Sequence, residues 1–125
     1  MAASDHLHPQ QLSMFMPARE LYNMNPNPAD MMVATSNSTD PTQRKKDMWA
    51  EKLDESKSGN REGLHESIAK QGVLEPVKIK HDSGAESHIA DGHHRVAAAN
   101  DINPNMEIPV EHFVPSQLPK QMVDF

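Results

Sequence analysis

The residues best suited to chemistry lie in one short run, Asp-Gly-His-His-Arg, from Asp91 to Arg95. Ile89-Ala90 before it reads as a strand that delivers the chain to Gly92, and the small residues after it predict a helix that begins at once. The first N–H groups of a helix have no internal partners and the helix dipole is positive there, so phosphates bind well. We expect Gly92 to let a ligand approach the backbone, and Arg95 to offer a charged fork suited to phosphate oxygens. This run therefore predicts an anion site.

The titratable side chains of the run leave two questions open. His93 and His94 can donate hydrogen bonds, and either imidazole could act as an acid or base near neutral pH. A structural metal is disfavoured, because adjacent helix residues diverge and His88 and Asp91 would face opposite sides of a strand. Asp91 could instead hold Mg²⁺ that bridges phosphates, or it could simply cap the helix.

The elements around the site predict an α+β fold with a short mixed sheet. Asp40-Pro41 followed by Gln43 is typical of a capping box at the start of a helix, and Gly72 is placed where a helix ends. Pro109 suggests that the last strand lies at a sheet edge. We predict helices over 40–58, 60–71 and 93–99, and strands over 76–80, 87–90 and 107–111.

The N-terminal third has a different character. Residues 1–39 show neither helical nor alternating periodicity and are predicted to be a largely irregular, extended arm; 40–114 form the domain and 115–125 a tail. One apolar island, Ser13–Tyr22, could pack on its own domain, exchange with a partner subunit to give a homodimer, or act as a peptide motif.

Composition bounds the function. The 125 residues are enough for one domain, and 36% hydrophobic residues with ten prolines predict a small core. A net charge of −6 argues against nonspecific DNA coating, and the absence of cysteine excludes thiol chemistry and disulfides. No apolar run would span a bilayer and the N-terminus does not resemble a secretory signal, so we expect a cytoplasmic protein without membrane partners.

The ordered set of elements from Leu64 to His112 resembles the ParB/sulfiredoxin superfamily. The set comprises a helix ending at Gly72, a Val-Leu-Glu-Pro loop, two strands, the Gly-His-His-Arg turn, a small-residue helix and Ile108-Pro109-Val110. ParB proteins carry Gly-Glu-Arg-Arg at that turn, and Gly92 and Arg95 match its first and last positions. The Asp-Gly-His-His-Arg form is similar to that of free-serine-kinase-like members and of small stand-alone ParB-like proteins of bacteriophages.

The resemblance implies a nucleotide- or phosphate-binding domain in an accessory or regulatory protein, located in the host cytoplasm if the protein comes from a phage. The predicted binding residues are Gly72, Gly92, His93, His94 and Arg95. The predicted cofactors are a nucleoside triphosphate or diphosphate with Mg²⁺ on Asp91. Kinase-like relatives use an acidic residue near Glu75 as a base, so Glu75 and His94 are the catalytic candidates for nucleotide hydrolysis or phosphotransfer. Whether the protein is an enzyme stays open.

Two alternative functions stand beside this one. The same fold could serve as a non-catalytic module that binds a host or phage protein, or it could be a ParB-like nuclease or DNA-binding protein. The last needs a basic groove, which an acidic chain does not favour. After Val110 only a short stretch remains, which we expect to be too short for the helix-turn-helix domain of chromosomal ParB proteins.

Overall fold

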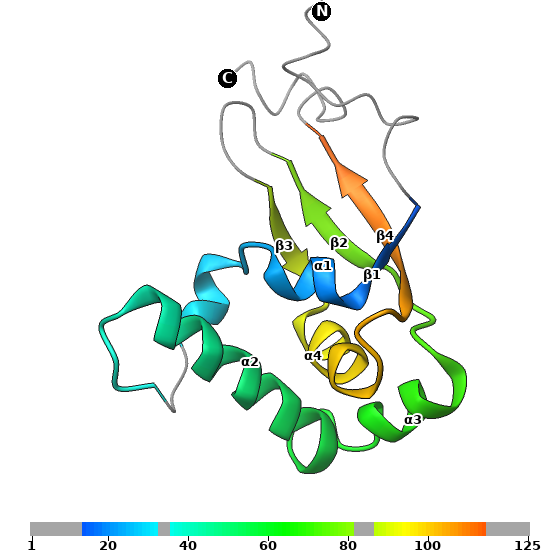
Figure 1. Cartoon of the computed structure of the whole chain (residues 1–125), viewed down its shortest axis with the longest axis horizontal. Coiled ribbons are helices and arrows are strands. Elements are labelled where there is room, and N and C mark those ends of the chain that lie inside the picture. Colours follow the sequence, from blue (N-terminus) through cyan, green and yellow to red (C-terminus); the bar gives the residue numbers. More distant parts are fainter. Residues whose placement is uncertain (1–13, 33–35, 82–86, 115–125) are drawn as a thin grey trace, which may run out of the picture.

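The computed structural model describes residues 14–32, 36–81 and 87–114. In chain order the elements are β1 (Phe15–Pro17), α1 (Ala18–Asn23), the 3-10 helix η3 (Pro28–Met31), α2 (Pro41–Ser58), α3 (Leu64–Gln71), β2 (Val77–Lys80), β3 (His88–Asp91), α4 (His93–Ile102) and β4 (Glu107–Phe113). The fold is α+β with a short mixed sheet and packed helices, as predicted from the sequence (Figure 1).

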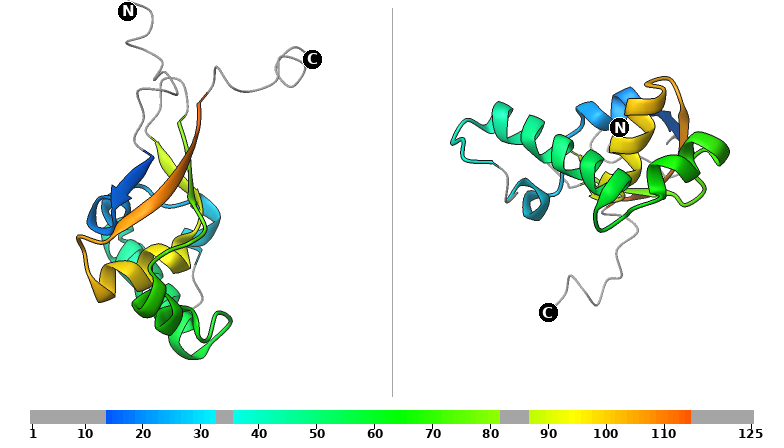
Figure 2. Two further views of the ribbon diagram at one scale, coloured as in Figure 1. Left: turned by 90° about the vertical axis from the view of Figure 1, so that its right-hand side faces the viewer. Right: turned by 90° about the horizontal axis from the view of Figure 1, so that it is seen from below.

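Within the described residues, the sheet has the strand order β1-β4-β2-β3. β2 runs parallel to β4, and the other two pairs are antiparallel. Val77 and Ile79 of β2 are buried, while Lys78 and Lys80, which alternate with them, are exposed, so one face of the sheet is covered. The helices gather on that side and toward one end of the sheet, as the views in Figures 1 and 2 show.

α4 is the central helix, since it contacts α1, α2, α3 and β2. Its residues Val96 to Ala99 are all buried, and their small side chains let the neighbouring helices approach from several directions. On the α2 side, Trp49 stacks on Tyr22 with ring centroids 4.8 Å apart. The predicted packing of a small-residue helix on the sheet is confirmed, although the helix continues to Ile102 rather than ending at Ala99.

The prediction of a largely irregular arm is wrong for residues 15–23 and 28–31, which form β1, α1 and η3. Ala18 and Leu21 are fully buried, and the N–H of Ala18 donates to Met106 O at 2.9 Å. The island therefore packs on its own domain. These elements are too short to show periodicity, which is why the sequence pattern missed them. Homodimer formation through the arm stays a prediction, and residues 1–13, 33–35 and 115–125 lie outside the described residues.

Three local predictions also need correction. The Asp40 side chain makes no capping hydrogen bond, and Gln43 Nε2 donates instead to Asp47 Oδ1 at 2.8 Å. The second helix begins at Leu64 and not at residue 60, because Gly63 has a left-handed φ of 91°. Pro109 does not lie on an edge strand, since β1 pairs with β4 and sets Phe15 opposite it. The strands β2, β3 and β4 are confirmed with ends shifted by one or two residues.

Candidate functional site

The site begins where β3 passes into α4 through Gly92. The φ of Gly92 is 111°, which residues with a side chain rarely adopt, and a Cβ there would lie 2.9 Å from Val77 Cγ2. Glycine is thus required because helix and strand approach each other closely. A side chain at this position would point toward β2. That Gly92 lets a ligand approach the backbone stays a prediction.

The start of α4 has the polarity expected of an anion site. The first helical hydrogen bond runs from Val96 N to Gly92 O at 3.0 Å, and no side chain among the described residues caps this end. The N–H groups of the first turn precede that bond and lie at the positive end of the helix dipole. Asp91 does not cap the helix, which removes one of the two roles that its position suggested.

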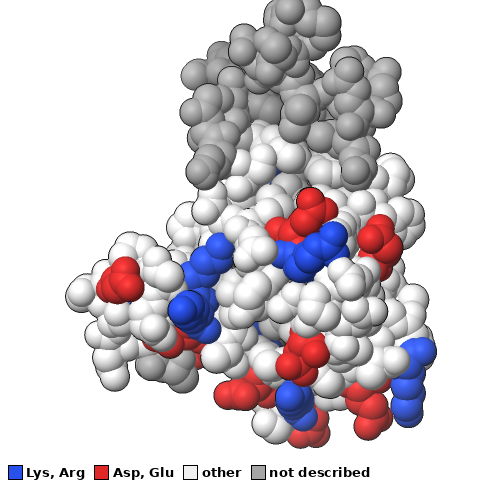
Figure 3. Space-filling view, in the orientation of Figure 1, with Lys and Arg blue, Asp and Glu red and all other residues white. Residues whose placement is uncertain are grey.

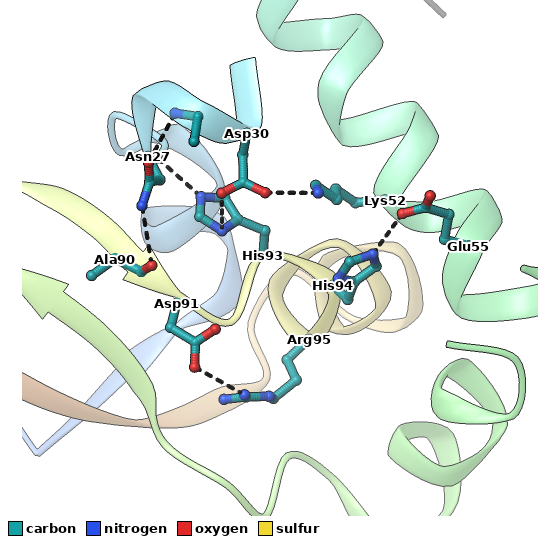
Figure 4. Close-up of polar contacts among 10 residues, drawn as sticks. Asn27, Asp30, Lys52, Glu55, Ala90, Asp91, His93, His94 and Arg95 are labelled. Atoms are coloured by element: carbon teal, nitrogen blue, oxygen red, sulfur yellow. Dashed lines mark hydrogen bonds and ion pairs between the residues drawn. The ribbon is translucent and has the colours of Figure 1, made fainter. Parts of the chain in front are cut away.

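His93 faces away from the other predicted site residues. Its Nε2 accepts the Asn27 N–H at 3.1 Å, so the proton of the neutral ring is on Nδ1, which lies 3.5 Å from Asp30 Oδ2 (Figure 4). Burial lowers the pKa of His93 to about 4, partly opposed by the Asp30 carboxylate. Lys52 Nζ in turn lies 2.7 Å from Asp30 Oδ1. His93 is therefore a neutral residue that fastens η3 to α4.

A cavity of about 260 Å³ opens on the opposite side of the α4 start, between α3, the loop before β2, and α4. Five of the predicted site residues line it together with Asp91: Gly72, Glu75, Gly92, His94 and Arg95. His93 does not. The apolar part of the lining comes from Leu64, Ile68, Val73 and Leu74, and the remaining lining residues are Arg61 and Ser67.

His94 is held on the cavity wall by a carboxylate. Its Nε2 lies 2.6 Å from Glu55 Oε1 of α2, and both side chains are mostly buried. An ionised carboxylate only accepts hydrogen bonds, so Nε2 carries a proton and Nδ1 is the nitrogen that can gain or lose one. A histidine fixed by a carboxylate in a cavity is an arrangement suited to acid–base work.

Arg95 is engaged with its own domain. Its Nη2 lies 3.6 Å from Asp91 Oδ2 (Figure 4). Its Nη1 donates to Pro76 O at 2.6 Å, and Nη2 also lies 3.9 Å from Glu75 Oε2. The guanidinium therefore fastens the loop before β2 to the first turn of α4. The two carboxylates are largely exposed, with side chains 60% and 83% accessible, so they form the rim of the cavity and not its floor.

The structure also brings in two residues that sequence reasoning missed. Glu55 sits in a run of mixed charges on α2, a pattern typical of a solvated helix face, and Arg61 lies in the turn before α3. No motif marks either of them. Only the crossing of α2 over α4, seen from below in Figure 2, places Glu55 beside His94.

Metal ligation by protein side chains alone finds no support. Within residues 14–32, 36–81 and 87–114, no three His, Cys, Asp or Glu side chains group together to hold a metal ion. Magnesium on Asp91 would need oxygen ligands from a bound phosphate and from water, as is usual for this ion. No helix in the described part of the chain is long and apolar enough to cross a membrane.

No protein-family model matches this chain, and neither a curated protein nor a solved structure gives a significant match. The ParB/sulfiredoxin resemblance thus stays a prediction resting on the residues quoted for it.

Proposed function

We propose that the protein binds a compact phosphorylated ligand, a nucleotide with Mg²⁺ in the first instance, in the cavity beside the start of α4. The observation that carries this is the meeting of Arg61, His94, Arg95 and the uncapped first turn of α4 at one cavity. Small-molecule sites usually occupy about 300–1,000 Å³. A volume of about 260 Å³ therefore favours a ligand no larger than a single nucleotide.

The two halves of the lining suit the two halves of such a ligand. The charged half offers donors and cations for phosphate oxygens. Leu64, Ile68 and Val73 offer an apolar surface for a flat ring or an aliphatic portion. The rim carboxylates Asp91 and Glu75 would repel a bare phosphate, and Mg²⁺ between them and the phosphate would offset that repulsion.

If the protein is an enzyme, His94 is better placed than Glu75 to act as the base. Glu75 is 83% exposed and its carboxylate faces Arg95, whereas His94 is mostly buried and is oriented by Glu55. In hydrolysis, His94 would take a proton from water as the oxygen–phosphorus bond forms and the bond to the leaving phosphate breaks. Without that step the same pocket would serve a regulatory protein as a ligand-controlled switch.

The charge distribution does not favour the nuclease alternative. On the face shown in Figure 3, the acidic and basic side chains of the described residues are interspersed, and no broad basic area covers this face. A protein that tracks a nucleic-acid backbone needs clustered lysine and arginine. The phosphate group is therefore proposed to belong to a small molecule.

A thermal-shift screen tests the proposal. Phosphate, pyrophosphate and nucleoside mono-, di- and triphosphates are added with and without Mg²⁺, with potassium chloride at matched ionic strength as the reference. A ligand at 100 times its Kd stabilises the folded state by about 2.7 kcal/mol, which is a clear shift.

Two alanine variants, each of a different histidine, provide the control for that screen. His94→Ala should remove the shift, whereas His65→Ala should keep it, because His65 lines a different cavity and pairs with Asp101. A flat response of the wild type to every phosphate compound would contradict the proposal and favour the protein-binding alternative.

A further inference from the structure

The side chain of Arg61, unlike that of Arg95, is not engaged by other groups of the described residues. Arg61 lies in the turn between α2 and α3, its backbone N–H donates to Glu55 O at 2.9 Å, and its side chain lines the cavity. The guanidinium has no ion pair or side-chain hydrogen bond to any residue in the part of the chain that the structure describes. Arg95, by contrast, is already bound to Pro76 O and faces two carboxylates.

Glu55 connects Arg61 to His94. The backbone oxygen of Glu55 accepts the N–H of Arg61, and its carboxylate holds the imidazole of His94 at 2.6 Å. One residue of α2 thus fixes both the backbone that carries the arginine and the ring that lies on the same cavity. The carboxylate is engaged by the imidazole, so its charge is partly compensated on this wall.

We propose that Arg61, whose backbone is fixed by Glu55, is the main side-chain contact for the ligand's phosphate. His94, oriented by the carboxylate of Glu55, turns its free Nδ1 to a ligand hydroxyl or a bound water on the same wall, and Arg95 is a positioning residue that shapes the cavity. This inference rests on the proposed function and specifies which wall of the cavity binds the ligand. An uncommitted guanidinium can offer its whole donor fork to phosphate oxygens, whereas a guanidinium bound to a carbonyl and facing two carboxylates has less to offer. The preferred ligand class is a phosphate or diphosphate ester with an apolar portion that reaches Leu64, Ile68 and Val73.

The test is calorimetric titration of the full chain with pyrophosphate and with a nucleoside diphosphate, each with and without Mg²⁺. Arg61→Ala should weaken binding about 10- to 100-fold, as expected for the loss of charge-assisted hydrogen bonds. Arg61→Lys should restore part of the affinity, because a point charge lacks the fork. Lys57→Ala is the matched control: it removes one positive charge four residues away, from a side chain at the other cavity. Its affinity should stay within about twofold of the wild type.

The role of Glu55 needs a separate readout. Glu55→Ala should weaken binding, and Glu55→Gln should recover most of the affinity, because the amide oxygen can still accept from His94 Nε2. Nitrogen–proton correlation spectra of the ring should show the Nε2–H tautomer in the wild type and in Glu55→Gln, and a mixture of tautomers in Glu55→Ala. A Glu55→Ala variant that keeps both the tautomer and the affinity would overturn the positioning role.

The outcomes separate the two proposals. If the wild type binds a probe and Arg61→Ala binds it as well as Lys57→Ala does, the proposed function stands and this inference is overturned. If the wild type binds none of the probes, both fail. Melting curves recorded without ligand verify that each variant is folded.

Discussion

His93 and His94 are consecutive residues in the first turn of α4, and they serve opposite purposes. His93 is 4% exposed, accepts a backbone N–H from Asn27 and is enclosed by η3 and α2. His94 is also held by a partner, Glu55, but it lines a cavity. On the side of His93, the imidazole, the Asn27 N–H, Asp30 and Lys52 pair with one another. On the side of His94, the polar groups converge on a space that a ligand could fill.

That contrast teaches where function should be sought in this fold. We name one side of α4 the η3 side: it is the side where His93 meets Asn27, Asp30 and Lys52. The polar groups on this side fix an N-terminal segment that has little apolar area of its own. The cavity side, with Arg61, Glu75, Asp91, His94 and Arg95, keeps cations and carboxylates close to a space between helices. Substitutions on the η3 side should change stability and leave binding intact. Those on the cavity side should change binding, and at Arg95, which is bonded to Pro76 O, they should change stability as well.

The largest effect is expected at Gly92, the residue that both sides share. Gly92→Ala forces a side chain into a left-handed backbone conformation and against Val77, so it should lower the free energy of unfolding by about 2–4 kcal/mol. Gly63→Ala is the control, since it has a φ of 91° but nothing within 4 Å, and it should cost only about 1–2 kcal/mol. Urea unfolding measures both. Equal losses of stability in the two variants would show that the close contact between Gly92 and β2 does not add to the cost of the substitution.

The next largest expected effect is the change of the free energy of unfolding with pH that His93 causes on the η3 side. Burial lowers the pKa of His93 from 6.5 to about 4, so the unfolded chain binds a proton there at pH values where the folded chain does not. The contribution of His93 is complete above pH 6.5 and is lost as the pH falls toward 4. At pH 5 the loss amounts to about 2 kcal/mol.

A glutamine variant of His93 isolates this effect. Unfolding free energies are measured between pH 7.5 and 5 for the wild type and for His93→Gln. The decrease on acidification should be about 2 kcal/mol smaller in His93→Gln than in the wild type, because glutamine does not titrate. If the free energy of unfolding of His93→Gln decreased on acidification as much as that of the wild type, a group other than His93 would take up the proton. The proposed difference between the two sides of α4 would then be wrong.

How far the sequence could lead is clear from the same two residues. The strand, the glycine and the helix start were predictable, because alternation, a breaker and small residues are all local signals. The divergence of the two histidines was also predictable, since neighbouring helix residues point in different directions. Which of them would face a cavity was not, because that depends on where η3 docks, and its four residues carry no periodic pattern.

The partners of the site were beyond sequence reasoning for a related reason. Glu55 reaches His94 across 39 positions of chain, and Arg61 joins the cavity only through the turn that follows α2. Charged residues on a helix usually face solvent, so the pattern around Glu55 gave no reason to separate it from its neighbours. Local patterns identify elements, while the pairing of side chains follows from the crossing of helices.

The third prediction concerns Arg95. It asks whether this residue shapes the cavity or contacts the phosphate of the ligand directly. Arg95→Ala removes the hydrogen bond to Pro76 O, and it should lower the free energy of unfolding by about 1–2 kcal/mol. Affinity for a phosphate ligand should fall less than in Arg61→Ala. Arg95→Lys should recover most of the stability, since an ammonium can still donate to one carbonyl. Unchanged melting together with a 100-fold loss of affinity would make Arg95 the principal phosphate contact instead.

The smallest effect is expected with polymeric nucleic acid, where the prediction is close to no binding. A phosphate site confined to one cavity offers few contacts to a duplex, and affinity for DNA grows with the number of phosphates that lysines and arginines neutralise. The chain has a net charge of −6, and the face shown in Figure 3 mixes both signs. At physiological salt, the Kd for random duplex should therefore be on the order of 10⁻⁴ M or weaker, and it should rise further with salt. Gel-shift titration at several salt concentrations measures this, with a nucleoside diphosphate as competitor. Tight, sequence-independent binding would mean that a surface outside the cavity recognises phosphate, and the division between a structural side and a binding side of α4 would no longer describe the function.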